Sequence, residues 1–529
     1  MRTFSSSGPV DTSFNYFAPR TELIQHAYTQ LVGENPDRGG HYLTVWAPRQ
    51  TGKTWIMLEV LKRLKAHADF EVAMFSMQSA QEAYTDADVL EVFMRYLQYR
   101  FGEHLPEVSS WKELPDLFTR RYFKKPVILI IDEFDACKEE FINKFANEFR
   151  SMYLERLNDV GKMNGEKNYL LHGLALIGVR SVLGIENMRG SPFNVQRSLH
   201  IPNLTHDEVT GLFTEYQQES GQRIEPDVVE RIFYEFNGQP GLTCWFGHLL
   251  TDEYNERREE PITMEHFRYA FMWATQGLPN NNILNIISKA KQAENKDILL
   301  NVFQADKKVA FSYDDPDVNY LYMNGVIDVE VTAEGLYTKF PSSFVQKRLF
   351  NYFSRTLFPY IGKLAQSFEA FEDLRDECGL NIRALFRYYQ AYIDANAHWL
   401  FKNAPRRVDL RIYEAVFHFN LYLYCATLLE KVDCKVWPEF PTGNGKIDLL
   451  VTDQDELYGI ELKTFSDLAD YAKAIRQAAQ YGKQLRVQEI WLVFFIEHID
   501  EEHRIKYEAA RTDSTTGVTV QPIFIETGQ

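Results

Sequence analysis

Residues 47–54 have the types and spacing of a phosphate-binding loop. They read APRQTGKT, with an apolar run before them and a helical pattern after them. Gly52 lets backbone N–H groups approach phosphates at the positive end of the following helix. Lys53 reaches the β- and γ-phosphates, and the Thr54 hydroxyl is placed to bind Mg²⁺. The pattern predicts a P-loop that binds ATP and Mg²⁺, formed by Pro48, Arg49, Gln50, Thr51, Gly52, Lys53 and Thr54.

A pair of carboxylates downstream completes this chemistry. Asp132 and Glu133 follow Val127–Ile131, an unbroken apolar run typical of a parallel strand buried on both faces. Asp132 is predicted to hold Mg²⁺ through water, and Glu133 to orient or deprotonate the attacking water. The alternative is that both residues simply begin a solvated loop.

The end of a third apolar run, Leu174–Val179, places Arg180 and Ser181 at the same edge of the predicted sheet. Ligands bind beyond the carboxyl ends of such strands, so either side chain could sense the γ-phosphate. An ordinary surface loop explains them equally well. Arg189 and Arg197 are candidate arginine fingers by position only.

A second set of residues near the C-terminus has the types needed for phosphodiester hydrolysis. Glu461 and Lys463 are two apart in a strand pattern and share one face, and a hairpin would bring Asp448 beside Glu461. Paired carboxylates suit Mg²⁺ or Mn²⁺, which would activate water while Lys463 stabilises developing charge. The alternative is a plain amphipathic hairpin facing solvent.

Other residues extend this second set. Glu414 lies on a mostly apolar helical stretch where a carboxylate needs a partner, and Gln477 and Tyr481 share one face of a later helix. Asp409 is a rival helix carboxylate, and Glu439 is a possible extra ligand. Arg406 and Arg407 could contact phosphate, although a solvated turn is the favoured interpretation. The predicted metal ligands of this site are Glu414, Asp448 and Glu461.

The elements that must position these residues indicate a multidomain α/β protein. Apolar runs at residues 42–47, 127–131 and 174–179 alternate with helical segments, which predicts a parallel sheet over about residues 20–200. Residues 203–284 look helical, and 285–355 show helices followed by short strands. Residues 356–403 form a helical connector, and residues 404–529 alternate again as a second α/β domain.

The stretches FNYFAPRTELIQ, VWAPRQTGKT and ILIIDEFD together resemble bacterial AAA-like and archaeal-type ATPases of the STAND and origin-recognition branch. This resemblance implies an ATPase core over 14–202, a helical lid over 203–284 and a winged-helix-like module over 285–355. Glu235–Thr243 (EFNGQPGLT) resembles the Gly-x-Pro turn of the family's lid. The sequence departs from the family at Gly178–Ser181, where a sensor Asn or Thr is usual. By resemblance, the adenine pocket is lined by Tyr16, Phe17, Pro19 and Arg20.

Residues 405–500 resemble the PD-(D/E)XK nuclease superfamily, in the group fused to AAA-like ATPases. The resemblance implies that Glu414, Asp448, Glu461 and Lys463 build the metal site. It also implies that Gln477 and Tyr481 contact the substrate backbone. Lys446-Ile447 replaces the usual Pro before the Asp.

Composition limits the classes of function. The chain has 57 Lys and Arg against 74 Asp and Glu, a formal charge of −17, which argues against non-specific coating of nucleic acid but allows a local basic groove. No signal peptide or membrane span is evident, so a cytoplasmic protein is expected. The cysteines form no C-x-x-C pair and are expected to be free thiols; they are Cys137, Cys244, Cys378, Cys425 and Cys434.

The sequence therefore predicts an ATP-gated, metal-dependent nuclease. DNA is favoured over RNA as the partner, and homo-oligomerisation follows from the resemblance to AAA proteins. Defence against foreign DNA rests on analogy of architecture. Two alternatives stay open: a nucleotide-switched binding module with an inactive nuclease-like domain, and an ATP-driven DNA translocase or remodeller.

Overall fold

A computed structural model describes most of the chain, and it separates into two compact units. The first comprises residues 1–289 and 311–344, and the second comprises residues 290–310 and 345–529. The structure describes residues 1–528 except for 6–7, 9, 38, 179–196, 256–257, 304–308, 359–372, 377–378, 408–410, 430–431, 433, 442–445 and 454–455.

The first unit is built on a parallel sheet with strand order β2-β3-β4-β1-β5. Every residue of β3 and β4 is buried, as expected for apolar strands covered on both faces. The predicted parallel α/β core is therefore confirmed. The strands are β1 (Tyr42–Trp46), β2 (Glu71–Ser76), β3 (Val127–Asp132), β4 (Leu171–Gly178) and β5 (Arg197–His200).

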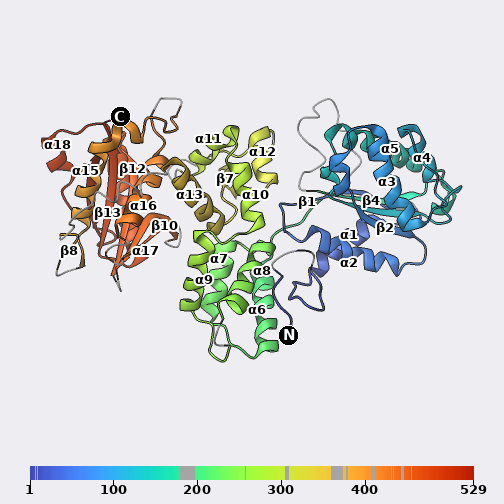
Figure 1. The fold of residues 1–529 in the computed structure, drawn as a ribbon, viewed down its shortest axis with the longest axis horizontal. Coiled ribbons are helices and arrows are strands. Elements are labelled where there is room, and N and C mark those ends of the chain that lie inside the picture. Colours follow the sequence, from blue (N-terminus) through green and yellow to red (C-terminus); the bar gives the residue numbers. More distant parts are fainter. Residues whose placement is uncertain are drawn as a thin grey trace. The chain divides into compact units, whose positions relative to one another are not determined.

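Helices cover the two faces of this sheet, and Figure 1 shows α1 and α2 on one side with α3 and α5 on the other. Alternation along β3 sends Ile128 and Ile130 into the core formed with α1 and α2, whereas Leu129 and Ile131 join the core of α3 and α5. The helices are α1 (Thr21–Val32), α2 (Lys53–Lys65), α3 (Asp86–Phe101), α4 (Leu114–Leu117) and α5 (Glu139–Asn158).

Strand β2 corrects the sequence interpretation, which made the segments between the predicted strands helical. Glu71–Ser76 is instead an edge strand that pairs with β3. Its outer residues are only half-buried, so the segment lacks the unbroken apolar run that marks β3 and β4. This strand carries Ser76 to the edge where Asp132 ends β3.

The rest of the first unit consists mainly of helices followed by a two-stranded hairpin. The predicted boundaries at 203, 285 and 355 stay predictions. The division into two compact units places residues 290–310 and 345–355 in the second unit. The elements are α6 (His206–Ser220), α7 (Pro226–Phe236), α8 (Pro240–His248), η5 (Leu249–Glu253), α9 (Met264–Gln276), α10 (Asn281–Ala290), α12 (Pro316–Met323), β6 (Asp328–Thr332) and β7 (Gly335–Lys339).

The second unit contains a mixed sheet with strand order β10-β11-β12-β13-β15-β14. Strands β10, β11 and β12 are antiparallel neighbours, and β12 pairs in parallel with β13 across the helix α17. The elements are α11 (Ala293–Val302), α13 (Ser343–Leu357), β8 (Arg375–Asp376), β9 (Gly379–Leu380), α15 (Ile382–Leu400), α16 (Glu414–Leu429), β10 (Lys435–Pro441), β11 (Lys446–Asp453), β12 (Glu456–Thr464), α17 (Leu468–Leu485), β13 (Glu489–Ile496), α18 (Glu501–Tyr507), β14 (Arg511–Thr512) and β15 (Thr519–Glu526).

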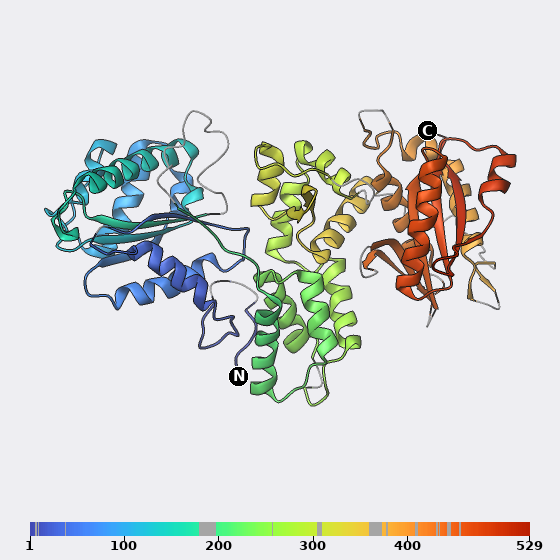
Figure 2. The ribbon, with the colours of Figure 1, turned by 180° about the vertical axis from the view of Figure 1, so that it is seen from behind.

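Opposite faces of this second sheet pack on different helices, which Figures 1 and 2 show from the two sides. Phe494 of β13 lies in a core with residues of α17, whereas the next residue, Phe495, stacks on Phe417 of α16 at 4.6 Å. The apolar stripe of α16 is therefore part of the core.

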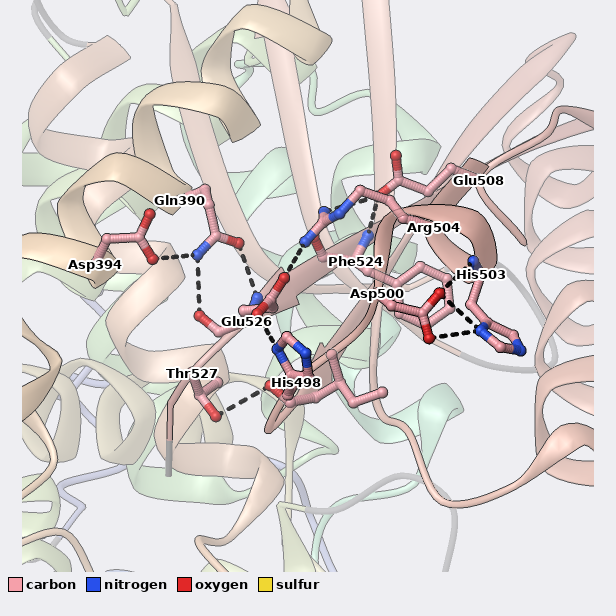
Figure 3. A network of polar contacts seen from close by, with 11 residues as sticks. Gln390, Asp394, His498, Asp500, His503, Arg504, Glu508, Phe524, Glu526 and Thr527 are labelled. Carbon is pink, nitrogen blue, oxygen red and sulfur yellow. Dashed lines mark hydrogen bonds and ion pairs between the residues drawn. The ribbon is translucent and has the colours of Figure 1, made fainter. Parts of the chain in front are cut away.

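The end of β15 is tied to α15 and α18 by polar contacts (Figure 3). The backbone N–H of Glu526 donates to Gln390 Oε1 at 2.8 Å, and Gln390 Nε2 donates back to the Glu526 carbonyl at 3.0 Å. Arg504 Nη2 donates to Glu526 Oε1 at 2.6 Å. These contacts fix α15 beside the sheet, although the sequence analysis treated residues 356–403 as a connector.

None of the helices in the described part of the chain has the length and apolar character of a membrane span.

Candidate functional sites

The phosphate-binding loop joins β1 to α2 in the first unit. Gln50 and Gly52 have φ values of 58° and 89°, in the left-handed region, and α2 begins at Lys53. Lys53 Nζ donates to the carbonyls of Ala47 and Pro48 at 2.7 and 2.8 Å, and Thr51 Oγ1 donates to the Pro48 carbonyl. The loop is thus a closed turn around a half-buried ammonium, at the N-terminus of a helix that favours anions.

The carboxylates at the end of β3 lie beside this loop. Thr54 Oγ1 donates to Asp132 Oδ2 at 2.7 Å, which brings together the two predicted Mg²⁺ ligands. The carboxylate of Glu133 accepts a hydrogen bond from Ser76 Oγ at 2.5 Å. Ser76 was missed by the sequence analysis, because its strand was missed.

Burial sets the charges of this first site. It lowers the pKa of Lys53 to about 8, while the carboxylates of Asp135 and Asp132 act in the opposite direction. Burial also raises the pKa of Asp132, against the hydrogen bond from Thr54 that lowers it. Lys53 and Asp132 are therefore two desolvated groups of opposite charge. The predicted phosphates would stabilise the ammonium of Lys53, and the predicted Mg²⁺ would stabilise the carboxylate of Asp132.

Helix α8 begins directly against the phosphate-binding loop. The Gly241 N–H donates to the Gln50 carbonyl at 3.0 Å, and Gln239 Nε2 donates to the Arg49 carbonyl at 3.0 Å. A Cβ added at Gly241 would lie 2.5 Å from Gln50 Cβ, so only glycine allows this approach. The Asn-Gly-Gln-Pro-Gly turn was visible in the sequence, but its contact with the loop was not.

The N-terminal segment predicted to line the adenine pocket packs on helix α6. Tyr16 is only 1% exposed, and its hydroxyl donates to Glu219 Oε2 at 3.0 Å. Arg20 donates to the Pro202 carbonyl at 2.7 Å and pairs with Glu208 at 3.4 Å. In these positions Tyr16 and Arg20 link the segment to α6, and their adenine contacts stay a prediction.

The structure describes only some of the predicted sensor and arginine-finger residues. Arg180, Ser181 and Arg189 lie outside the described residues. Arg197 begins β5, and its Nη1 donates to Gln30 Oε1 at 2.6 Å. Within its own chain Arg197 therefore contacts α1, and a finger role toward a neighbouring copy stays a prediction.

In the second unit, the strand register brings Asp448 and Glu461 together. Leu449 pairs with Ile460, so the next positions toward the open end are Asp448 and Glu461. Asp448 Oδ2 accepts the Leu462 N–H at 2.7 Å. The hairpin inferred from the sequence thus places the two carboxylates side by side.

Lys463, Gln477 and Tyr481 gather at the same carboxylates. Lys463 Nζ donates to Glu461 Oε1 at 2.9 Å. Gln477 Nε2 lies 3.5 Å from the same oxygen and donates to the Tyr481 hydroxyl at 2.9 Å. Helix α17 therefore presents both of its predicted substrate residues to the strand carboxylates.

Helix α16 adds one predicted residue and one that was not predicted. Glu414 Oε2 accepts the Thr464 N–H at 2.7 Å, which joins the start of α16 to the end of β12. His418, one turn later, is buried and its Nε2 contacts the Asp448 carbonyl at 2.9 Å. His418 is not among the residues predicted for this site, although its i, i+4 spacing from Glu414 was a signal.

The donor set fits a hard divalent cation in its chemistry. Asp448, Glu461 and Lys463 are 8%, 0% and 4% exposed, so two carboxylates and one ammonium share a buried place. Among the described residues, no group of three or more His, Cys, Asp and Glu could together hold an ion. Carboxylate oxygens are the donors that Mg²⁺ prefers, and the predicted metal ligands Glu414, Asp448 and Glu461 stay a prediction.

The structure describes only some of the remaining residues that the sequence suggested for this second site. Asp409 and the side chain of Glu439 lie outside what the structure describes. Arg406 forms a β-bridge with Ile412, and the Arg407 N–H donates to the Arg411 carbonyl at 2.8 Å. Arg407 is thus held beside Arg411, just before α16.

One protein-family model matches the part of the chain that contains the phosphate-binding loop. Residues 6–255 match the AAA-like domain. The AAA-like domain as matched contains the phosphate-binding loop, Asp132, Glu133 and the start of α8. No curated protein matches the chain.

Solved structures similar to the chain include a Walker-type ATPase of Pyrococcus abyssi, with 13% identity, a TM-score of 0.39, and coverage of 65% of this chain and 99% of that one. Cdc6p from Pyrobaculum aerophilum has 14% identity, a TM-score of 0.36 and coverage of 65% and 95%. The ORC2 protein of Aeropyrum pernix has 13% identity, a TM-score of 0.37 and coverage of 64% and 94%. These likenesses are distant and carry no argument about function.

Proposed function

We propose that the protein is an ATP-dependent nuclease, in which the AAA-like domain binds and hydrolyses ATP and the second unit cleaves nucleic acid. The observation that carries the nuclease proposal is the convergence of Asp448, Glu461 and Lys463 with Gln477 at one end of a mixed sheet. Burial of charge is costly, and strongly buried charged groups cluster at functional sites, so two buried carboxylates beside a buried lysine support a site that binds or reacts.

The ATPase half rests on the geometry around the phosphate-binding loop. Lys53 and Thr54 are placed for the phosphates and Mg²⁺, and Glu133 is placed for the attacking water. In the resting arrangement Ser76 holds the Glu133 carboxylate, so this hydrogen bond has to weaken before Glu133 can accept a proton from water. Helix α8 contacts the same loop and can transmit a change in nucleotide to the lid.

The nuclease half would use Asp448 and Glu461 to hold a divalent cation, which supplies an activated water and polarises the phosphodiester when bound. Lys463 donates to Glu461, and with a substrate present its ammonium would stabilise the charge that develops on phosphate oxygens. Gln477 and Tyr481 would contact the substrate backbone, as side chains at i and i+4 on one helix face.

One observation favours a second function, binding without cleavage. Glu461 Oε1 already accepts from Lys463, and Asp448 Oδ2 accepts from the backbone of Leu462. If these contacts persist when substrate is bound, the second unit would bind nucleic acid or a protein partner without hydrolysing it. The nucleotide would then switch binding on and off.

The wider role follows from the same proposal. DNA is the favoured substrate over RNA, the protein is proposed to act in the cytoplasm, and assembly into a homo-oligomer would let an arginine of one copy reach the ATP of the next. A role in defence against foreign DNA is proposed from the combination of an ATPase with a nuclease.

The deciding experiment measures cleavage of single- and double-stranded DNA and RNA by purified full-length protein with Mg²⁺ or Mn²⁺, with and without ATP. We expect Asp448→Asn to abolish cleavage while ATP hydrolysis continues. Lys53→Ala should abolish ATP hydrolysis and reduce cleavage if ATP gates the nuclease. ATP hydrolysis without any cleavage, together with nucleic-acid binding that depends on ATP, would replace the nuclease by the binding function.

A further inference from the structure

A cavity of about 250 Å³ opens beside the candidate nuclease site, on the side of the turn that precedes α16. It shares Glu414, Lys463 and Gln477 with that site, and extends beyond them to Arg407, Arg411 and Lys473. The three added cations have no part in the nuclease chemistry proposed above.

The charge of this cavity is opposite to that of the chain. Four cations line it, against the two carboxylates of Glu414 and Asp470, whereas the whole chain carries a formal charge of −17. Glu414 also accepts the Thr464 N–H, Asp470 accepts the Ser466 hydroxyl, and Lys463 pairs with Glu461. A group of cationic side chains around one cavity of an acidic protein favours an anionic ligand.

Backbone contacts before α16 hold Arg407 beside Arg411. Arg406 forms a β-bridge with Ile412, and the Arg407 N–H donates to the Arg411 carbonyl. Arginine pairs are well suited to phosphate because their planar donors bind oxygen atoms in pairs. Lys473 approaches the cavity from α17 as an exposed side chain.

The apolar lining favours a phosphate over a base. Tyr471 and Phe494 border the cavity but are only 3% and 1% exposed, and their rings pack on each other at 5.2 Å. These two rings therefore offer no open face for stacking, which base recognition commonly uses. The third aromatic residue of the lining, Phe465, is half-buried and packs on Phe494 and Phe524, and the other accessible groups are charged and polar side chains.

We propose that the Arg407–Arg411–Lys473 pocket binds a phosphate group of the nucleic-acid strand, next to the phosphodiester held by Lys463 and Gln477. This inference rests on the proposed nucleic-acid function of the second unit and names the group that anchors the substrate. The phosphate belongs either to the strand's 5′ end or to an internal phosphodiester, and these two sources have different consequences for binding.

The test is a binding measurement by fluorescence anisotropy on full-length protein in EDTA, where the outcome is independent of cleavage. Single-stranded DNA with a 5′-phosphate, the same strand with a 5′-hydroxyl, and a circular strand are compared. The variants are Arg411→Ala and Lys473→Glu. Lys483→Glu is the matched control, because it makes the same charge change on an exposed lysine of α17 that does not line the pocket.

We expect Lys473→Glu and Arg411→Ala to weaken binding at least tenfold more than Lys483→Glu. Each should also reduce the salt dependence of the binding constant by about one ion per lost contact. If the 5′-phosphate strand alone loses affinity, the ligand is the terminal phosphate; if all three strands lose it equally, the ligand is an internal phosphodiester.

Equal binding by the pocket variants and Lys483→Glu would overturn the pocket proposal. That result leaves the nuclease proposal untouched, because cleavage by wild-type protein in Mg²⁺ is measured separately. Conversely, a loss of binding in the pocket variants without cleavage by the wild type would retain the pocket and reject the nuclease.

Discussion

At the scale of single residues, the structure around Lys53 predicts how nucleotide affinity depends on pH. Lys53 is half-buried, and desolvation lowers its pKa to about 8 from its usual 10.5. The side chain is therefore an ammonium below about pH 8 and increasingly a neutral amine above it. Only the ammonium attracts phosphate, so nucleotide affinity depends on pH in a range that is easily reached.

We predict that ATP affinity falls about twofold between about pH 7 and about pH 8 and roughly tenfold by about pH 9, because an increasing fraction of Lys53 must be protonated before it binds phosphate. Equilibrium binding of a fluorescent ATP analogue at each pH measures this. Lys53→Arg binds more weakly but should show a flat profile, because arginine stays charged. The same decline in Lys53→Arg would assign the pH effect to another group.

Glu133 allows a second prediction at the residue scale. Glu133→Gln removes the carboxylate that would accept a proton from water, while the phosphate contacts of Lys53 and Thr54 are kept. We expect ATP turnover to fall by about 10²- to 10⁴-fold, the usual contribution of a general base, with ATP affinity changed less than about threefold. Phosphate release and equilibrium binding are the measurements, and a parallel loss of both would mean that Glu133 acts in binding.

At the scale of elements, the close approach of α8 to the phosphate-binding loop depends on one glycine. We predict that Gly241→Ala separates α8 from Gln50 and lowers ATP affinity by about tenfold, as overpacking costs about 1–3 kcal/mol. Gly211→Ala on α6 is the matched control, since its added Cβ would meet nothing within 4 Å. Thermal melting of both variants tests folding, and equal ATP affinities would show that the α8 contact does not serve nucleotide binding.

The end of β15 gives a second element-scale prediction. Burial raises the pKa of Glu526, but hydrogen bonds from His498 and Arg504 outweigh it and the pKa lies below its usual 4.5. The folded state thus favours the carboxylate, so its contribution to stability is present above about pH 4.5 and is lost as the pH falls through the lowered pKa. Melting of the second unit should shift less with acid in Glu526→Gln than in wild type, and identical shifts would contradict this.

At the scale of the whole molecule, the second unit is discontinuous in sequence. Residues of α11, α13 and α15 belong to it, and Tyr389 of α15 donates to buried Asn420 of α16 at 2.8 Å. The boundary predicted at residue 404 therefore cuts through contacts of this unit. A domain excised at 404 would lose apolar surface that α15 covers in the full chain.

We predict that a fragment of residues 404–529 is unstable, whereas a fragment beginning at residue 373 folds better because it restores α15. Thermal unfolding followed by circular dichroism compares the two. A cooperative transition of the shorter fragment at the same temperature would mean that α15 adds nothing to this unit.

The sequence by itself determined the strands and motifs whose signals are local. The apolar runs of β1, β3 and β4, the phosphate-binding loop, and the order of Glu414, Asp448, Glu461 and Lys463 were all readable, because burial on both faces and strand alternation leave marks in neighbouring residues. The hairpin register followed from the same alternation.

Only the tertiary structure decided what depends on distant contacts. The sequence did not reveal edge strand β2, because its pattern is half-polar. The hydrogen bond from Ser76 to Glu133 was therefore missed as well. The contact of α8 with the loop, the burial of Tyr16 against α6 and the basic pocket beside α17 join segments far apart in sequence. Such contacts arise from how helices pack on sheets, which no local pattern of residues records.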